Sequence, residues 1–232
     1  MTSPSITAVG DVFDVIDVID RLAGLRAGAP VDILRQRRPQ AREHAQQSHL
    51  ALFEPAEPDG DGTGSAFTRT ERFAVAAFVA TLHTHPGAAA FYAAALADSG
   101  ATPALRQAIE AEAAAGHAQG PYGRYPAGPL SAEDVDGPQL VVAAAHRAVL
   151  GARLSAALAH AHLLVFHPRD ASAAALQALL DAGWSTTEIV TLSQLIAFLA
   201  FQIRVVIGLQ ALAAHPPSAS SFSAASEPSR EA

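Results

Sequence analysis

The stretch "ERFAVAAFVATLHTHPGAAAFY" (residues 71–92) runs from a glutamate through an apolar segment to two histidines. Its apolar residues recur at the spacing of an α-helix and do not alternate as in a strand. Thr68 and Glu71 lie three residues apart in the pattern of a capping box, which predicts a helix start near Thr68. Pro86 cannot continue that helix. The stretch therefore predicts an apolar helix followed by a bend.

Helical spacing continues over almost the whole chain, and short alternating runs rich in β-branched residues are nearly absent. We therefore expect an all-α fold, with residues 23–30 forming a turn. The expected helices cover residues 12–22, 39–53, 68 to the bend at 86, 88–97, 103–116, 138–166, 171–182 and 186–213. Asp170 is the expected cap of the helix at 171–182, and Ser185 with Glu188 predicts a capping box for the last helix.

Composition divides the chain into four parts. These are an N-terminal helical arm (1–55), a linker rich in Pro, Gly and Asp (56–66), a helical core (67–213) and a tail of disordered composition (214–232). Within the core, "GPYGRYPAGPLSAEDVDGP" (residues 120–138) predicts a long loop. Long loops inside compact helical domains are often lids or subunit contacts.

Residue usage excludes several chemistries. The 232 residues include no cysteine and no lysine, and the 15 residues that are either lysine or arginine are all arginine. Thiol catalysis, thiolate metal sites and lysine Schiff bases are therefore excluded. A hydrophobic content of 50% supplies enough apolar surface for a sizeable core.

Charge and hydropathy bear on partners and location. The formal net charge of −7 argues against nucleic acid and against an anionic membrane as partners. The cluster Arg35, Arg37, Arg38 and Arg42 is expected to be a solvated face or an interface patch. The first 20 residues carry four aspartates and no basic segment, which is not the pattern of a secretory signal. Since the longest apolar run is shorter than the roughly 20 residues of a membrane span, we expect a cytoplasmic protein.

Two segments resemble a known superfamily. Residues 67–96, "FTRTERFAVAAFVATLHTHPGAAAFYAAAL", resemble the "LSxxERExVALxVxxLNGCxYCxxxH" core of the alkylhydroperoxidase (AhpD-like) and carboxymuconolactone decarboxylase (CMD) superfamily. Residues 167–209, "HPRDASAAALQALLDAGWSTTEIVTLSQLIAFLAFQIRVVIGL", are similar to the C-terminal part of its peroxidase-related members, where a "LxxAGxSdxEIvel" helix pair leads into a long apolar helix with an "nRv" stretch. The resemblance covers about residues 67–212 and is closest to divergent members described as CMD domain proteins.

This resemblance implies an AhpD-like all-α fold that assembles into a homo-oligomer, a trimer or a hexamer. Active relatives reduce hydroperoxides with a CxxC pair assisted by a glutamate and a histidine. Carried over to this sequence, the motif glutamate is Glu71, the two cysteines fall at His83 and Pro86, and the helper histidine falls at Ala90. Three of the four catalytic positions have therefore changed type.

The missing cysteines decide the expected chemistry. A peroxidatic step of this kind needs a thiolate nucleophile and a resolving thiol, so the chain is not expected to be a dithiol peroxidase. Decarboxylase relatives use acid/base chemistry without a redox cofactor, so we expect no cofactor here and a cysteine-independent reaction on a small organic substrate. The candidate catalytic residues are Glu71, His83 and His85, with His146 and Arg204 in a second tier.

The alternative function is a non-catalytic oligomeric scaffold, or a small-molecule-binding protein that kept the fold. In that case Glu71 only caps a helix, and His83 and His85 only bind backbone groups at a helix end. Arg204 lies among apolar residues, so it is expected to pair with a carboxylate such as Glu71, or to reach a subunit interface or a pocket. Convergence of the candidates in one concave pocket would favour catalysis.

Three other histidines raise the question of a metal site. His160 and His162 are two residues apart on one predicted helix, and His167 follows its end. A helix presents two ligands to one ion at a spacing of four residues, and no HExxH motif occurs. We therefore expect no metal site.

Overall fold

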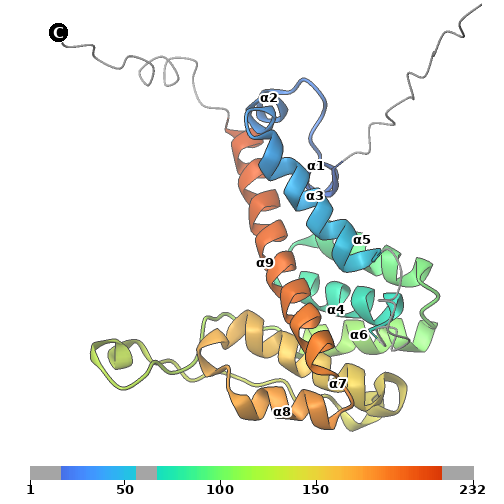
Figure 1. Ribbon diagram of the computed structural model, residues 1–232, viewed down its shortest axis with the longest axis vertical. Helices are drawn as coiled ribbons and strands as arrows, with labels where there is room; N and C mark the ends of the chain where they lie inside the picture. The colour runs from blue at the N-terminus through green and yellow to red at the C-terminus, as the bar shows by residue number, and fades with distance from the viewer. Residues whose placement is uncertain (1–16, 56–66, 216–232) are drawn as a thin grey trace, which may run out of the picture.

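The computed structural model of this protein describes residues 17–55 and 67–215. Over these residues the chain forms helices and no strand, with one isolated bridge between Gly123 and Val135. The expected all-α class is confirmed. In Figure 1 the longest helix, α9 (Thr186–Ala214), runs from the N-terminal helices at one end to α7 and α8 at the other.

The other α-helices follow one another through short turns and one long loop. In chain order they are α1 (Val18–Ala23), α2 (Pro30–Gln36), α3 (Pro39–Phe53), α4 (Arg69–Leu82), α5 (Pro86–Asp98), α6 (Pro103–Ala115), α7 (Ala144–Phe166) and α8 (Ala173–Asp181). Two 3₁₀ turns, η1 (Pro129–Glu133) and η2 (Pro168–Asp170), flank α7 in the sequence. The start of the helix expected at 12–22, the linker 56–66 and nearly all of the tail expected at 214–232 lie outside the described residues.

Both predicted capping boxes are confirmed, and α3 has the predicted bounds. Helix α2 was not predicted. Pro30 occupies its first position, where the fixed φ of proline suits a helix and the missing N–H costs nothing. The side chain of Val31 is buried.

Three predicted helix starts are wrong. Helix α5 begins at Pro86 instead of residue 88, because proline suits the first position of a helix. Helix α7 begins at Ala144 instead of residue 138, because the amide of Ala143 is bound by a carboxylate oxygen of Glu112 in α6 (3.0 Å). Residues 138–143, called the strap below, are not helical. Helix α8 is capped by Ser172, whose hydroxyl accepts from the amide of Ala175 (3.3 Å), and not by Asp170.

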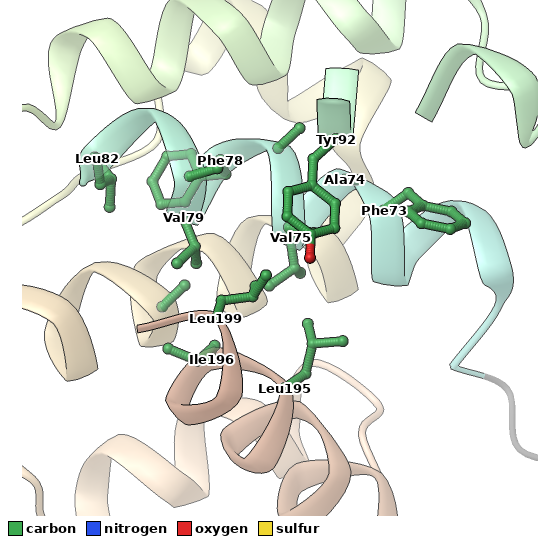
Figure 2. Packing of buried hydrophobic residues seen from close by; sticks show 14 of the residues in the cluster. Phe73, Ala74, Val75, Phe78, Val79, Leu82, Tyr92, Leu195, Ile196 and Leu199 are labelled. Atoms are coloured by element: carbon green, nitrogen blue, oxygen red, sulfur yellow. The ribbon is translucent and has the colours of Figure 1, made fainter. Parts of the chain in front are cut away.

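Helix α4 is the centre of the core. Every residue from Arg72 to Ala80 is buried, and the helix packs against α5, α6, α7 and α9. Figure 2 shows Val75 and Val79 of α4 on the side that faces α9, near Leu199. A helix that is apolar on all sides is stable only in the interior, which explains the composition of the stretch at 71–82.

The N-terminal helices α1–α3 pack against α9 and are tied together by buried ion pairs. Arg35 pairs with Asp17 (3.1 Å) and contacts Asp20, which also binds Arg42 (2.8 Å). The expectation of a solvated or interface patch is therefore wrong for these two arginines. They neutralise carboxylates that would be costly to bury alone.

By length and hydropathy, helices α7 and α9 are both long and apolar enough to cross a membrane. In each helix, 44% of the 18-residue apolar stretch that meets these criteria is buried inside the protein. Core helices of soluble proteins meet the same criteria, so this finding is weak evidence for a membrane span.

Candidate functional site

The five predicted site residues do not gather in one place. Glu71 lies in the first turn of α4 and His83 caps its other end. Twelve residues at 1.5 Å per residue separate them by about 18 Å along the helix axis. A single substrate-sized pocket therefore does not hold both groups.

The carboxylate of Glu71 makes two structural contacts. One of its carboxylate oxygens accepts from the amide of Thr68 (2.8 Å), completing the capping box. The other accepts from Nε of Arg153 in α7 (3.3 Å). The expected partner Arg204 is instead exposed, makes no ion pair among the described residues, and donates to the carbonyl of Ala200 (3.0 Å). The prediction that Arg204 pairs with a carboxylate is thus wrong within these residues.

Arg153 was missed by the sequence analysis and joins three helices. Besides Glu71 it binds Glu188 in α9 (3.2 Å) and the carbonyl of Gly183 (2.5 Å), and it stacks on the ring of Trp184. Burial alone would raise the pKa of Glu188, but hydrogen bonds from Ser185 and Arg153 outweigh it and hold that pKa below its ordinary value.

His83 is partly buried at the C-terminus of α4, and its Nε2 has no hydrogen-bond partner among the described residues. Burial, and then the positive charge of nearby Arg204, lower the pKa of His83. The next residue, Thr84, has φ 53°, a left-handed conformation that carries strain in a β-branched residue. Among the five candidates, Arg204 is the one whose charge acts on the imidazole of His83.

His85 is held by both of its ring nitrogens. Nδ1 accepts from the amide of Ala88, which caps α5 (3.0 Å), so Nε2 carries the proton and donates to Gln210 of α9 (3.2 Å). The side-chain amide of Gln210 in turn donates to the carbonyl of Leu22 (3.4 Å). This chain of bonds joins α5, α9 and α1, which is a structural use of the imidazole.

His146 lies apart from the other candidates. Its Nδ1 is 2.6 Å from Oε1 of Glu112, a carboxylate oxygen that also accepts from the amide of Ala143. Glu112 is only 1% exposed. The pair fastens the start of α7 to α6.

The site that the structure assembles from histidines lies elsewhere, between α7, α8 and the strap. It is a cavity of about 180 Å³ whose walls are mainly apolar. The lining residues include Leu140 of the strap, Leu163 of α7 and Leu179 of α8, together with the three histidines His160, His162 and His167. We call it the histidine cavity.

Two of these histidines hold the long loop 117–143 at its ends. His162 donates from Nε2 to the carbonyl of Gly116 (3.0 Å). His167 donates from Nε2 to the carbonyl of Pro138 (2.7 Å), and its Nδ1 faces the carboxylate of Asp170 (3.1 Å). The cavity wall is therefore formed by side chains that also fix the loop.

His160 has a free hydrogen-bonding position. Its Nε2 is 3.1 Å from the hydroxyl oxygen of Ser193 in α9, and this hydroxyl donates to the carbonyl of Ile189. The imidazole therefore donates from Nε2, and Nδ1 is left without a partner among the described residues. His160 is 6% exposed. Burial lowers the pKa of both His160 and His162, so both rings are neutral at pH 7.

A second hollow of about 320 Å³ adjoins the histidine cavity. His160, Leu163 and Ala175 line both spaces. The second hollow is also bordered by Ser193 and by the N-terminus of α8 at residues 171–173. We call it the α8 hollow.

The histidines do not form a metal site. Residues 17–55 and 67–215 contain no group of three or more His, Asp or Glu side chains placed to hold an ion. His162 and His167 have ring centroids 5.9 Å apart, but their Nε2 atoms are bonded to backbone carbonyls.

Comparison with known proteins identifies no relative. No family model, no curated protein and no solved structure matches the chain significantly.

Proposed function

We propose that this chain is an AhpD-like protein without a dithiol, and that it binds a small, largely apolar organic molecule in the histidine cavity. The resemblance of residues 67–212 to the superfamily supports the ancestry. The observation that carries the binding function is the cavity of about 180 Å³, in which apolar side chains surround three histidines. Ligand sites are commonly apolar pockets with a few polar groups that orient the ligand.

The arrangement of the predicted catalytic residues favours binding over catalysis. Glu71 is engaged by Thr68 and Arg153, and both nitrogens of His85 are bonded within the fold. Acid/base catalysis on one substrate needs its groups within hydrogen-bonding reach of the same molecule, and Glu71 and His83 are about 18 Å apart along α4. Dithiol reduction of hydroperoxides is excluded by the absence of cysteine.

We also propose a homo-oligomer. Helix α9 leaves several large apolar side chains exposed along its length, namely Val190, Phe201, Ile207 and Leu212. Apolar side chains gathered on one helix are typical of subunit contacts. Arg204 lies on the same exposed part of α9, where a contact with another subunit would give it a partner.

The binding function predicts that the purified protein takes up toluene and that filling the cavity prevents it. An apolar cavity of about 150 Å³ is enough for benzene, so a cavity of about 180 Å³ accommodates a molecule of this size. Ala159 lines the cavity, and we expect Ala159→Phe to abolish toluene binding in a ligand-observed NMR titration.

The control is Ala148→Phe, an equal increase in volume at an exposed position of the same helix. This variant should bind toluene as the unmodified protein does. No binding by the unmodified protein at millimolar toluene, or equal binding by a folded Ala159→Phe variant, would contradict the proposed function.

A further inference from the structure

We infer that two copies of this chain pack against each other through α9, with the two helices antiparallel and related by a two-fold axis at the height of Leu199. This inference rests on the proposed homo-oligomer and adds the contact and its geometry. It is carried by one row of exposed residues on α9, which we call the seam. The seam consists of Val190, Gln194, Ala197, Phe201, Arg204 and Gly208.

The seam has the spacing of a surface on which helices pair. Its residues follow one another at alternate intervals of four and three residues and extend over about 27 Å of the helix axis. All of them are exposed, and the side chains of Val190 and Phe201 are 57% and 50% exposed. Residues repeated every 3.5 positions stay on one side of a helix that packs along another helix. The seam therefore suits a second helix that lies along it.

The exposed side of α9 differs in composition from that of its neighbour. Most seam residues are apolar or glycine, and Ile207 beside the seam is 47% exposed. Helix α3 packs against α9 (Figure 1), and its exposed residues include Gln40, Glu43 and Gln47. An apolar face of this kind is typical of contact with another molecule.

The polar residues of the seam favour a protein over lipid as that molecule. Arg204 and Gln194 lie on the same face as Phe201, and a charged side chain in hydrocarbon is costly. Helices that lie on anionic membranes are rich in Lys and Arg, whereas this chain has no lysine and a formal net charge of −7. Arg204 donates from one nitrogen to the carbonyl of Ala200 (3.0 Å), and a guanidinium has further donors to offer a partner.

The seam is complementary to itself in size when the two helices are antiparallel. With the axis at the height of Leu199, residues equally far before and after Leu199 face each other. Ala197 then lies opposite Phe201 of the second copy, and Val190 lies opposite Gly208. Each bulky side chain meets a small residue, which lets the two helices interdigitate.

The same arrangement gives the polar seam residues a partner. Gln194 lies five residues before Leu199 and Arg204 five residues after it, so the amide oxygen of one copy accepts from the guanidinium of the other. Parallel packing would instead set each residue opposite itself. It would bring two Arg204 charges together and leave a gap between two Gly208 residues. The order of residues in α9 therefore selects the antiparallel pair.

A two-fold contact also restricts the assembly. Each residue pair occurs twice across such an axis, so the contact is isologous. It fits a dimer, or a hexamer that contains two-fold axes. It does not fit a simple ring of three subunits, whose contacts are heterologous.

The test is cysteine cross-linking of the full chain, which has no cysteine of its own. The double variant Val190→Cys with Gly208→Cys places a thiol of each copy opposite a thiol of the other, as a disulfide requires. The space around the Cβ at position 208 is open, and position 190 is exposed, so we expect the fold to be kept. Mild oxidation at micromolar concentration should convert most of the protein into a product of two chains on a non-reducing gel.

The two single variants are the matched controls. Residues 190 of the two copies lie about 27 Å apart along the antiparallel helices, and so do residues 208. Val190→Cys alone and Gly208→Cys alone should therefore cross-link no more than Ala148→Cys, an exposed position on α7 that measures random collision. Cross-linking of either single variant above that level would show parallel packing and overturn the inference.

Light scattering of the unmodified protein separates the remaining outcomes. An oligomeric mass without cross-linking of the double variant would overturn the α9 geometry and leave the proposed homo-oligomer standing. A monomeric mass would overturn both, and a monomer that co-sediments with phosphatidylcholine vesicles would assign the seam to lipid. Toluene binding in the histidine cavity is independent of all these results.

Discussion

At the scale of single residues, Arg153 of α7 joins α4 and α9 through ion pairs. Its guanidinium is partly buried and contacts Glu71, Glu188 and the carbonyl of Gly183. Removing it leaves two carboxylates without their cation in a largely desolvated place. Such a loss costs more than the loss of an exposed ion pair, because the remaining charges keep their desolvation penalty.

We expect Arg153→Met to lower the free energy of unfolding by about 2–4 kcal/mol at pH 7, measured by urea denaturation. The control is Arg147→Met on the same helix. Within residues 17–55 and 67–215 this side chain donates only to the carbonyl of Val142, so the expected loss is below about 1 kcal/mol. The pKa of Glu188 is lowered in the folded protein, so its stabilising contribution is present above the ordinary value of 4.5 and is lost as the pH falls through the folded value. The cost of Arg153→Met should accordingly shrink in that range. Equal losses for the two variants at pH 7 would contradict this role.

At the scale of the helix, Gly151 divides α7 into two parts. Its φ of 69° and ψ of 174° are not helical, and they produce a kink between the segment with His146 and the segment that lines the histidine cavity. Only glycine adopts such a conformation without strain. The direction of the cavity-lining segment thus depends on one residue without a side chain.

Gly151→Ala should destabilise the protein by about 1–3 kcal/mol, since the kink forces a strained backbone on alanine although no atom lies within 4 Å of the added Cβ. Gly208→Ala provides the comparison within α9, where the space around the Cβ is also open and the backbone is helical. That substitution should stabilise the protein by about 0.5–1 kcal/mol. Thermal unfolding of both variants checks the pair, and a Gly151→Ala variant as stable as the unmodified protein or more so would show that the kink does not require glycine.

At the scale of the whole molecule, four histidines have a lowered pKa because burial disfavours their charged form. They are His49, His83, His160 and His162, and the pKa of His49 falls to about 4, with the charge of Asp17 acting in the opposite direction. Each unfolded imidazole takes up a proton near 6.5, whereas the folded one does so only at lower pH. The unfolded state therefore binds more protons below pH 6.5.

Stability should consequently fall as the pH drops from about 6.5 to about 5, a range in which most carboxylates are still ionised. Urea denaturation at half-unit pH intervals measures the slope. His49→Gln should flatten it, whereas His44→Gln, at an exposed position of the same helix, should leave it unchanged. A stability that stays constant between pH 6.5 and 5 would contradict the burial of these rings as neutral groups.

Local features were predictable from the sequence because they depend on neighbouring residues. The capping boxes at Thr68 and Ser185 join residues three positions apart, and the apolar stretch at 71–82 could be stable only in an interior. The same reasoning gave the all-α class and most helix positions. It failed for Asp170, since Ser172 competes for the same helix end and lies at the right distance from Ala175.

Contacts between distant segments were decided by the tertiary structure. The partner of Glu71 is Arg153, 82 residues later, and no local pattern distinguishes it from Arg204. The spacing of His160 and His162 argues that they face different sides of a helix, yet both line one cavity because α8 and the strap enclose α7 from two directions. The sequence by itself therefore determined an all-α protein without thiol chemistry. Which polar groups meet was decided only by packing, since burial selects partners by distance in space and not along the chain.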